Sequence, residues 1–200
     1  MRKGRMEAFS DGVFAVIITI MVLEMKSPQG TDFAALRPIL PVFFSYVLSF
    51  VYIGIYWNNH HHLLQAAQHV TGGVLWANLH LLFWLSLTPF VTAWMGENHF
   101  APWPVALYGL VLLLAGTANF ILIRTLIACH GNASILAASI GRDKKGMVSI
   151  VVYTAAIPLS FVQPWIACAG YVFVAVMWLL PDPRIEKTLR KESSASSEET

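Results

Sequence analysis

Residues 5–25 read RMEAFSDGVFAVIITIMVLEM, a largely apolar stretch with Ser10 and Asp11 near its start. If Ser10 caps a helix, that helix begins at Asp11 and reaches only about 22 Å before Met25. The hydrocarbon core of a bilayer is about 30 Å thick. A helix that begins near Arg5 reaches about 31 Å and spans the core. The sequence therefore predicts a membrane-spanning helix that contains Ser10 and Asp11 near the inner membrane edge.

Asp11 needs an explanation in such a helix, because a carboxylate there is costly unless it is paired or faces water. Glu7 lies four residues earlier and repels it. Arg5 points to a different side of the helix and is not an obvious partner. One interpretation is therefore a polar network with another helix. The other is that Asp11 is solvated and favoured by the positive end of its own helix.

The composition indicates an integral membrane protein. Of the 200 residues, 56% are hydrophobic and 12% are charged, whereas a soluble domain carries about 25% charged residues. The net charge of +2 does not suggest a nucleic-acid partner, and the two cysteines form no CxxC or zinc-ligand pattern. Nucleophile elbows, phosphate-binding loops, paired acidic metal motifs and a TVGYG potassium filter are all absent from the sequence. An enzyme is not expected.

Six apolar segments are predicted to span the membrane. They cover residues 6–25, 37–57, 72–95, 103–128, 147–162 and 164–181. Pro89 predicts a kink near the outer end of the third segment. The predicted fold is thus an all-α integral membrane protein, with a six-helix transmembrane domain over 1–181 and a polar, partly disordered cytoplasmic tail over 182–200. Four spans plus a re-entrant hairpin is the alternative.

The basic residues predict the orientation. If the N-terminus is cytoplasmic, the inner segments hold 11 of the 13 Lys and Arg residues, and the outer loops hold only Lys26 and Arg37. Basic residues are concentrated on the cytoplasmic side of membrane proteins. An even number of spans with both termini cytoplasmic produces this asymmetry.

One face of the first span carries a stripe of residues with helical spacing. The stripe consists of Phe9, Gly12, Val16, Thr19, Ile20 and Leu23. It includes Thr19, the only hydroxyl deep in the span. From periodicity alone, the stripe is interpreted as a packing face between helices or as a pore lining. Glu24 at its outer end either concentrates cations or is simply solvated.

The segment YWNNHHHL, residues 56–63, places three histidines in a row. Successive helical residues are rotated by about 100°, so the three cannot all face one metal ion. A polar cluster at the cytoplasmic end of the second helix, at the depth of Asp11, is expected instead. A membrane-embedded metal or redox protein that uses these histidines is one alternative function. Asn78 and His80 in the third span are each expected to form a hydrogen bond between helices. Another alternative function is a proton-coupled transporter that uses Asp11 and His80.

The sequence resembles the transmembrane protein 175 family, which comprises potassium channels of endosomes and lysosomes in animals and shorter bacterial and archaeal homologues. The motif Arg5-x-x-x-Phe9-Ser10-Asp11 before an Ile/Val-rich helix resembles the family signature. YWNNHHH resembles the W-x-x-H-H pattern of the second helix, and LLFWLSLTPFVTAWMGE resembles the end of the third. The resemblance covers all six predicted spans.

The resemblance implies a homotetrameric potassium channel of the prokaryotic plasma membrane, with first helices that line a pore on the fourfold axis. Its partners would be potassium ions, lipid and copies of itself, with no cofactor and no metal. It implies apolar constriction rings at Val16, Ile20 and Leu23, a selectivity contribution from Thr19, and an outer vestibule at Glu24. It also implies a cytoplasmic-side network of Arg5, Phe9, Ser10, Asp11, Trp57, His60 and His61. The family often has Ile or Leu at position 16, so the Val16 ring is expected to be slightly wider.

Overall fold

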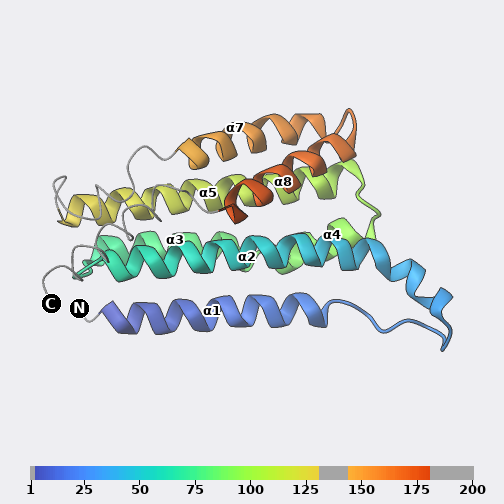
Figure 1. Cartoon of the computed structure of the whole chain (residues 1–200), viewed down its shortest axis with the longest axis horizontal. Helices are drawn as coiled ribbons and strands as arrows, with labels where there is room; N and C mark the ends of the chain where they lie inside the picture. The colour runs from blue at the N-terminus through green and yellow to red at the C-terminus, as the bar shows by residue number, and fades with distance from the viewer. Residues whose placement is uncertain (1–2, 131–143, 181–200) are drawn as a thin grey trace, which may run out of the picture.

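The computed structural model describes residues 3–130 and 144–180, and every regular element within them is helical (Figure 1). The elements are α1 (Lys3–Leu23), the 3-10 helix η1 (Phe33–Ile39), α2 (Leu40–Ala66), α3 (Gly72–Ser86), α4 (Thr88–Glu97), α5 (Pro102–His130), α7 (Lys144–Leu159) and α8 (Pro164–Leu179). The helices lie along one common direction, and successive passes run in opposite directions, with α3 and α4 forming a single pass. We call the end where α1 begins and α2 ends the inner end of the bundle.

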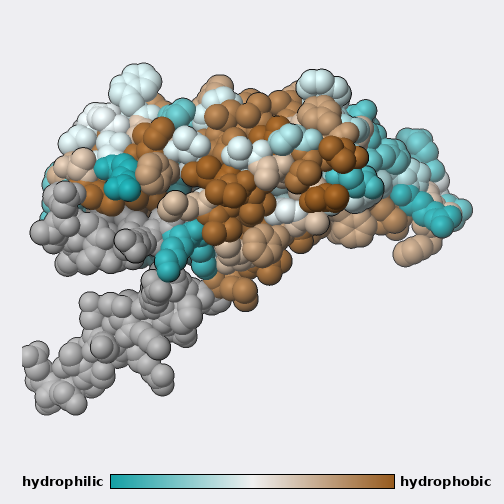
Figure 2. Space-filling view, turned by 90° about the horizontal axis from the view of Figure 1, so that it is seen from above, coloured by the Kyte–Doolittle hydropathy of each residue, from teal (hydrophilic) through white to brown (hydrophobic). Residues whose placement is uncertain are grey.

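Among the described residues, four helical stretches are long and apolar enough to cross a membrane. They are Lys3–Leu23, Phe33–Ala66, Gly72–Glu97 and Pro102–His130. α7 and α8 have 16 residues each, about 24 Å of helix, so the full count of six spans stays a prediction. Hydrophobic side chains cover the middle of the visible surface, and hydrophilic ones gather at the end that carries η1 (Figure 2).

The first predicted span agrees with α1, whose start at Lys3 confirms that Ser10 lies inside the helix and does not cap it. The second predicted span ended at residue 57, but α2 continues to Ala66. Buried Leu63 and Leu64 explain the extension, because they join the core on the same face as the preceding turns. The predicted tail over 182–200 lies outside the described residues.

The break between α3 and α4 at Leu87 confirms the kink predicted from Pro89. Pro89 occupies the first turn of α4. It has no backbone N–H and so cannot bond to the carbonyl group of the preceding turn, in α3. The helix is therefore interrupted at Leu87 alone, and the two helices together remain long enough to cross a bilayer.

In the described part of the chain, the core consists of two clusters. The first joins α1, α2, α3 and α5 around Phe14, Leu64, Leu81 and Leu122. The second joins α2, α4, α5, α7 and α8, and its largest members are the tyrosines Tyr52, Tyr108, Tyr153 and Tyr171. α1 contributes only to the first cluster and lies at one edge of the bundle, on the side opposite α7 (Figure 1).

Candidate functional site: the outer helix α1 and its polar contacts

α1 has one buried face and one exposed face. The buried face consists of Met6, Ser10, Phe14, Ile17 and Met21, which pack toward α2, α3 and α4. The stripe predicted from periodicity, which we call the exposed stripe, points away from the described helices: Phe9 is 55% exposed, Val16 54%, Ile20 40% and Leu23 78%. These side chains are apolar, and no helix in the described part of the chain covers them. A lipid environment or other subunits must therefore accommodate them.

Thr19 places one hydroxyl group within this apolar face. Its hydrogen is shared between the carbonyl oxygens of Val16, at 2.9 Å, and Ala15, at 3.1 Å. The backbone thus satisfies the donor, and the lone pairs of Thr19 Oγ1 remain on the exposed side. A hydroxyl oxygen in this state is able to coordinate a cation.

A buried hydrogen-bonded chain joins α1, α3 and α2 near the inner end. Ser10 Oγ donates to the Met6 carbonyl oxygen at 2.8 Å, so it accepts from Asn78 Nδ2 at 3.0 Å. Asn78 Oδ1 then faces His60 Nε2 at 2.7 Å, which requires that His60 Nε2 carry a hydrogen. Ser10, Asn78 and His60 are all at most 1% exposed. Three helices are therefore linked by polar groups that water does not reach.

A second, more exposed set of contacts links α1 to α2 directly. Trp57 Nε1 donates to Asp11 Oδ1 at 2.9 Å. The ring of His61 stacks on Trp57, with centroids 5.9 Å apart, and His61 Nδ1 lies 3.5 Å from Glu7 Oε1. Asp11 thus has a partner on another helix and also remains exposed to solvent. We call Ser10, Asp11, Trp57, His60, His61 and Asn78 the polar cluster.

Three predicted residues lie outside the polar cluster. Arg5 and Phe9 are exposed on α1, and neither side chain makes a hydrogen bond or ion pair with any residue in the described ranges. His80 was expected to bond to another helix, but it accepts a hydrogen bond at 2.9 Å from Trp84 on its own helix α3. That bond differs from the expectation because His80 lies on the exposed face of α3, four residues before Trp84.

At the other end of α1, Glu24 borders a cavity of about 220 Å³ together with Lys26, Glu97 and His99. Lys26 Nζ pairs with Glu97 Oε1 at 3.0 Å. The nearby cation therefore neutralises Glu97, whereas Glu24 makes no ion pair with any other residue that the structure describes.

The bonds of Asn78 to Ser10 and His60 confirm the hydrogen bond between helices expected for it. Sequence reasoning missed two other contributors at the inner end. Glu7 lies one turn before Asp11 and also faces His61. Lys3 Nζ donates to the carbonyl oxygens of Gln65 and Ala67 at the end of α2. The sequence feature that could have predicted this contact is a lysine at the start of the first helix. The next helix is antiparallel and ends at the same level, where its last carbonyl groups are free and favour a cation.

The histidines of the YWNNHHH segment point in different directions, as the helical rotation predicts. His60 faces Asn78 inside the bundle, and His61 stacks on Trp57 at its edge. Within residues 3–130 and 144–180, no three His, Cys, Asp or Glu side chains lie together as metal ligands would.

Comparison with known proteins adds a consistent set of relatives. A family model described as endosomal/lysosomal potassium channel TMEM175 matches residues 5–89. A potassium channel of a Chryseobacterium species is 54% identical over 191 residues, which cover 96% of this chain and 100% of the relative. The human endosomal/lysosomal proton channel TMEM175 is 34% identical over 83 residues, covering 36% of this chain and 16% of the relative.

A solved structure extends the likeness to most of the fold. It is a crystal structure of a lysosomal potassium-selective channel TMEM175 homolog from Chamaesiphon minutus, with a TM-score of 0.73 and 26% identity. The match covers 88% of this chain and 96% of that chain. The identity to the Chryseobacterium protein over its whole length, together with this fold, establishes that the chain belongs to the family of the endosomal/lysosomal potassium channel TMEM175.

Proposed function

We propose that the chain forms a passive potassium-selective channel whose pore is lined by the exposed stripe of α1. The observation that carries this proposal is the contrast between the two faces of that helix. One face is buried in the chain's own core, and the other presents apolar side chains and one hydroxyl to the outside. Relatives from Chryseobacterium and Streptomyces collinus are named potassium channels, which supports this assignment.

A single α1 cannot enclose a pore, so several copies must bring their stripes to a common axis. We propose a homotetramer around a fourfold axis, six spans per subunit and both termini on the cytoplasmic side of the plasma membrane. The alternating direction of the helices (Figure 1) is consistent with an even number of crossings. The position of α1 at one edge of the bundle leaves it accessible to neighbouring subunits.

In this channel Val16, Ile20 and Leu23 form successive apolar rings. A narrow apolar ring removes part of an ion's hydration shell, and it gates by losing water. Potassium is less strongly hydrated than sodium, so it pays a smaller dehydration penalty at such a ring. Thr19 Oγ1 contributes a ring of oxygen atoms between the apolar rings and offsets part of this penalty.

The polar cluster holds α1 in register in the proposed channel. Ser10 and Asp11 connect α1 to two neighbouring helices at its inner end, so the rings farther along the helix keep their rotation about its axis. Arg5 and Phe9 are exposed at the same end, and we propose that they act against other subunits in the assembled channel.

Substitution of Val16 tests the pore-lining role with a matched control. Val16→Asn places a polar amide in a proposed ring, and Val22→Asn places the same amide on an exposed part of α1, rotated by about 120° from Val16. We expect reconstituted wild-type protein to show a potassium-over-sodium reversal potential that Val16→Asn reduces and Val22→Asn preserves. Equal ion preference in both variants and the wild type would refute the α1 pore.

The alternative function is a proton-coupled transporter that uses the titratable side chains of Asp11 and His80. It would require Asp11 and His80 to act together. Asp11 bonds to Trp57, whereas His80 bonds to Trp84, so the two side chains have separate partners. A reconstituted Asp11→Asn, His80→Gln double variant separates the candidates: retained potassium current excludes a mechanism that depends on both groups.

A further inference from the structure

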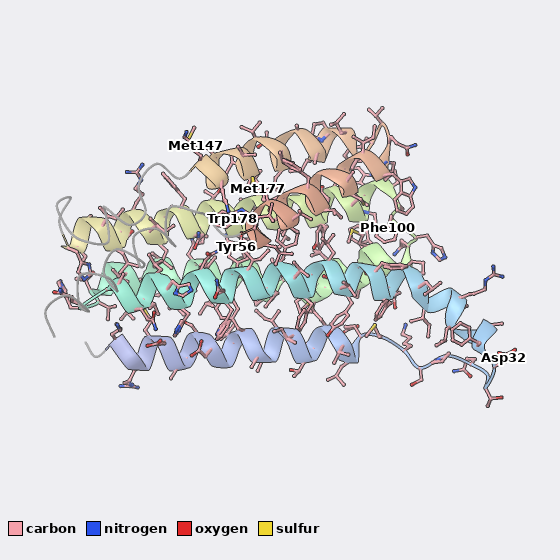
Figure 3. The ribbon with its side chains drawn as sticks, in the orientation of Figure 1. Asp32, Tyr56, Phe100, Met147, Met177 and Trp178 are labelled. Atoms are coloured by element: carbon pink, nitrogen blue, oxygen red, sulfur yellow. The ribbon has the colours of Figure 1, made fainter. Side chains whose placement is uncertain are left out.

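A second cavity lies on the far side of the bundle from α1. It has a volume of about 290 Å³ and is lined by residues of α2, α5, α7 and α8. Figure 3 shows Tyr56, Met147 and Trp178 around the point where α8 ends. α8 has 16 residues whereas α2 has 27 and α5 has 29, so α8 stops before it covers the inner ends of its neighbours.

The cavity carries polar groups that the protein itself does not satisfy. Tyr56, Asn59 and Asn119 line it, and their side chains form no hydrogen bond with any residue of the described part of the chain. All three are partly buried. Because no buried polar side-chain atom of the described residues lacks a partner, these groups are accessible and are free to bond to a polar molecule in the cavity.

Among the described residues, the charged groups at the cavity are positive. Arg124, near the end of α5, lines it and lies over the ring of Phe120 at 4.9 Å. Arg124 forms no ion pair with a described residue, and none of the described lining residues is Asp or Glu. Lys145 lies nearby, over the Trp178 ring at 5.8 Å. The exposed guanidinium of Arg124 is therefore available to an anion that enters the cavity.

We propose that this cavity binds the headgroup of an anionic phospholipid from the inner leaflet. The guanidinium of Arg124 pairs with the lipid phosphate, because its fork of N–H donors matches phosphate oxygens. Tyr56, Asn59 and Asn119 bond to the polar atoms of the headgroup and glycerol. Basic pockets between transmembrane helices are suited to such headgroups.

The surroundings accommodate the rest of the lipid. A volume of about 290 Å³ is at the lower end of the range for small-molecule sites, about 300–1,000 Å³, so it holds a headgroup and not the acyl chains. Phe120 and Met147 line the cavity and are also exposed apolar side chains, and Ile121, Val176 and Leu179 are exposed on the lining helices α5 and α8. These residues form an apolar surface on which the acyl chains pack.

The test measures lipid binding and does not depend on ion flux, so its result is independent of the proposed channel function. Purified protein is titrated with phosphatidylglycerol or phosphatidylcholine, and bound lipid is counted by native mass spectrometry. We expect a preference for phosphatidylglycerol. Arg124→Gln should weaken that binding at least about fivefold, the factor for one basic side chain beside an anionic lipid surface.

Arg37→Gln is the matched control, because it removes the same charge from η1 at the other end of the molecule. It should bind phosphatidylglycerol as the wild type does. If Arg124→Gln does not fold, Asn119→Leu serves as the second variant and should also weaken binding. Equal loss in Arg124→Gln and Arg37→Gln, or no lipid preference in the wild type, overturns the proposal.

A third arm uses inorganic phosphate alone and distinguishes a lipid from a free anion. We expect phosphate at millimolar concentration neither to displace phosphatidylglycerol nor to raise the melting temperature of the protein. Competition at that concentration would show that the cavity is a site for a soluble anion and would overturn its assignment to lipid.

Discussion

Replacing Asn78 by leucine removes the middle member of the buried chain that joins α1, α2 and α3. The substitution deletes the 3.0 Å bond to Ser10 Oγ and the 2.7 Å bond from His60 Nε2. Ser10 keeps its bond to the Met6 carbonyl oxygen, but the His60 N–H has no acceptor in a site that is 1% exposed. Hydrogen bonds between membrane helices contribute about 0.6 kcal/mol each on average and at most about 1.7. Two lost bonds therefore lower the free energy of unfolding by about 1–3 kcal/mol.

The assay is reversible unfolding in mixed micelles with increasing dodecyl sulfate, followed by circular dichroism. Asn58→Leu is the control, because Asn58 is exposed on α2 and its side chain has no hydrogen-bond partner in the described part of the chain. The effect of Ser10→Ala should also be smaller in the Asn78→Leu background than in the wild type. The reasoning is refuted if Asn78→Leu changes stability no more than Asn58→Leu, within about 0.5 kcal/mol.

Two further substitutions probe packing and the outer end. Gly109→Ala should lower the free energy of unfolding by about 1–3 kcal/mol, because its Cβ would overlap the phenol of Tyr171. The control in thermal unfolding is Gly54→Ala, which should be neutral or stabilising because no atom lies within 4 Å of its Cβ. Equal effects of the two substitutions would contradict the close packing of Gly109 against Tyr171. Glu24→Gln should lower potassium conductance in dilute salt, because it removes a negative charge that attracts cations. The difference in conductance from the wild type should shrink near 1 M salt, where charges are screened beyond about 3 Å. Unchanged conductance in dilute salt would count against an attraction of cations by Glu24.

Length and periodicity were sufficient to predict α1. The helical rise and the thickness of the bilayer required a start before Ser10, and the structure begins the helix at Lys3. The stripe of Val16, Thr19 and Ile20 likewise follows from helical geometry alone. For Asp11 the sequence left two interpretations open, and the structure combines them: Trp57 bonds to the carboxylate, which stays exposed.

The contacts between helices were harder to predict because their partners are far apart in the chain. Ser10 and Asn78 are 68 positions apart, and Trp57 and Asp11 are 46. No local pattern states which helices become neighbours or how each is rotated. This is why the contact of Glu7 with His61 was not predicted. The sequence could not predict the polar groups that line the cavity beside Arg124, because they come from helices that are far apart in the chain.

The sequence by itself determined that this is an all-helical membrane protein and that α1 carries a stripe ending near Glu24, because composition and periodicity are properties of single segments. Only the tertiary structure decided which face of α1 is turned inward. Phe14, Ile17 and Met21 pack into the core, while the face with Val16 and Thr19 stays open. Both faces are apolar enough for lipid, so hydrophobicity does not choose between them; the choice depends on which side chains fit against α2, α3 and α4 and on the hydrogen bond that Ser10 makes there.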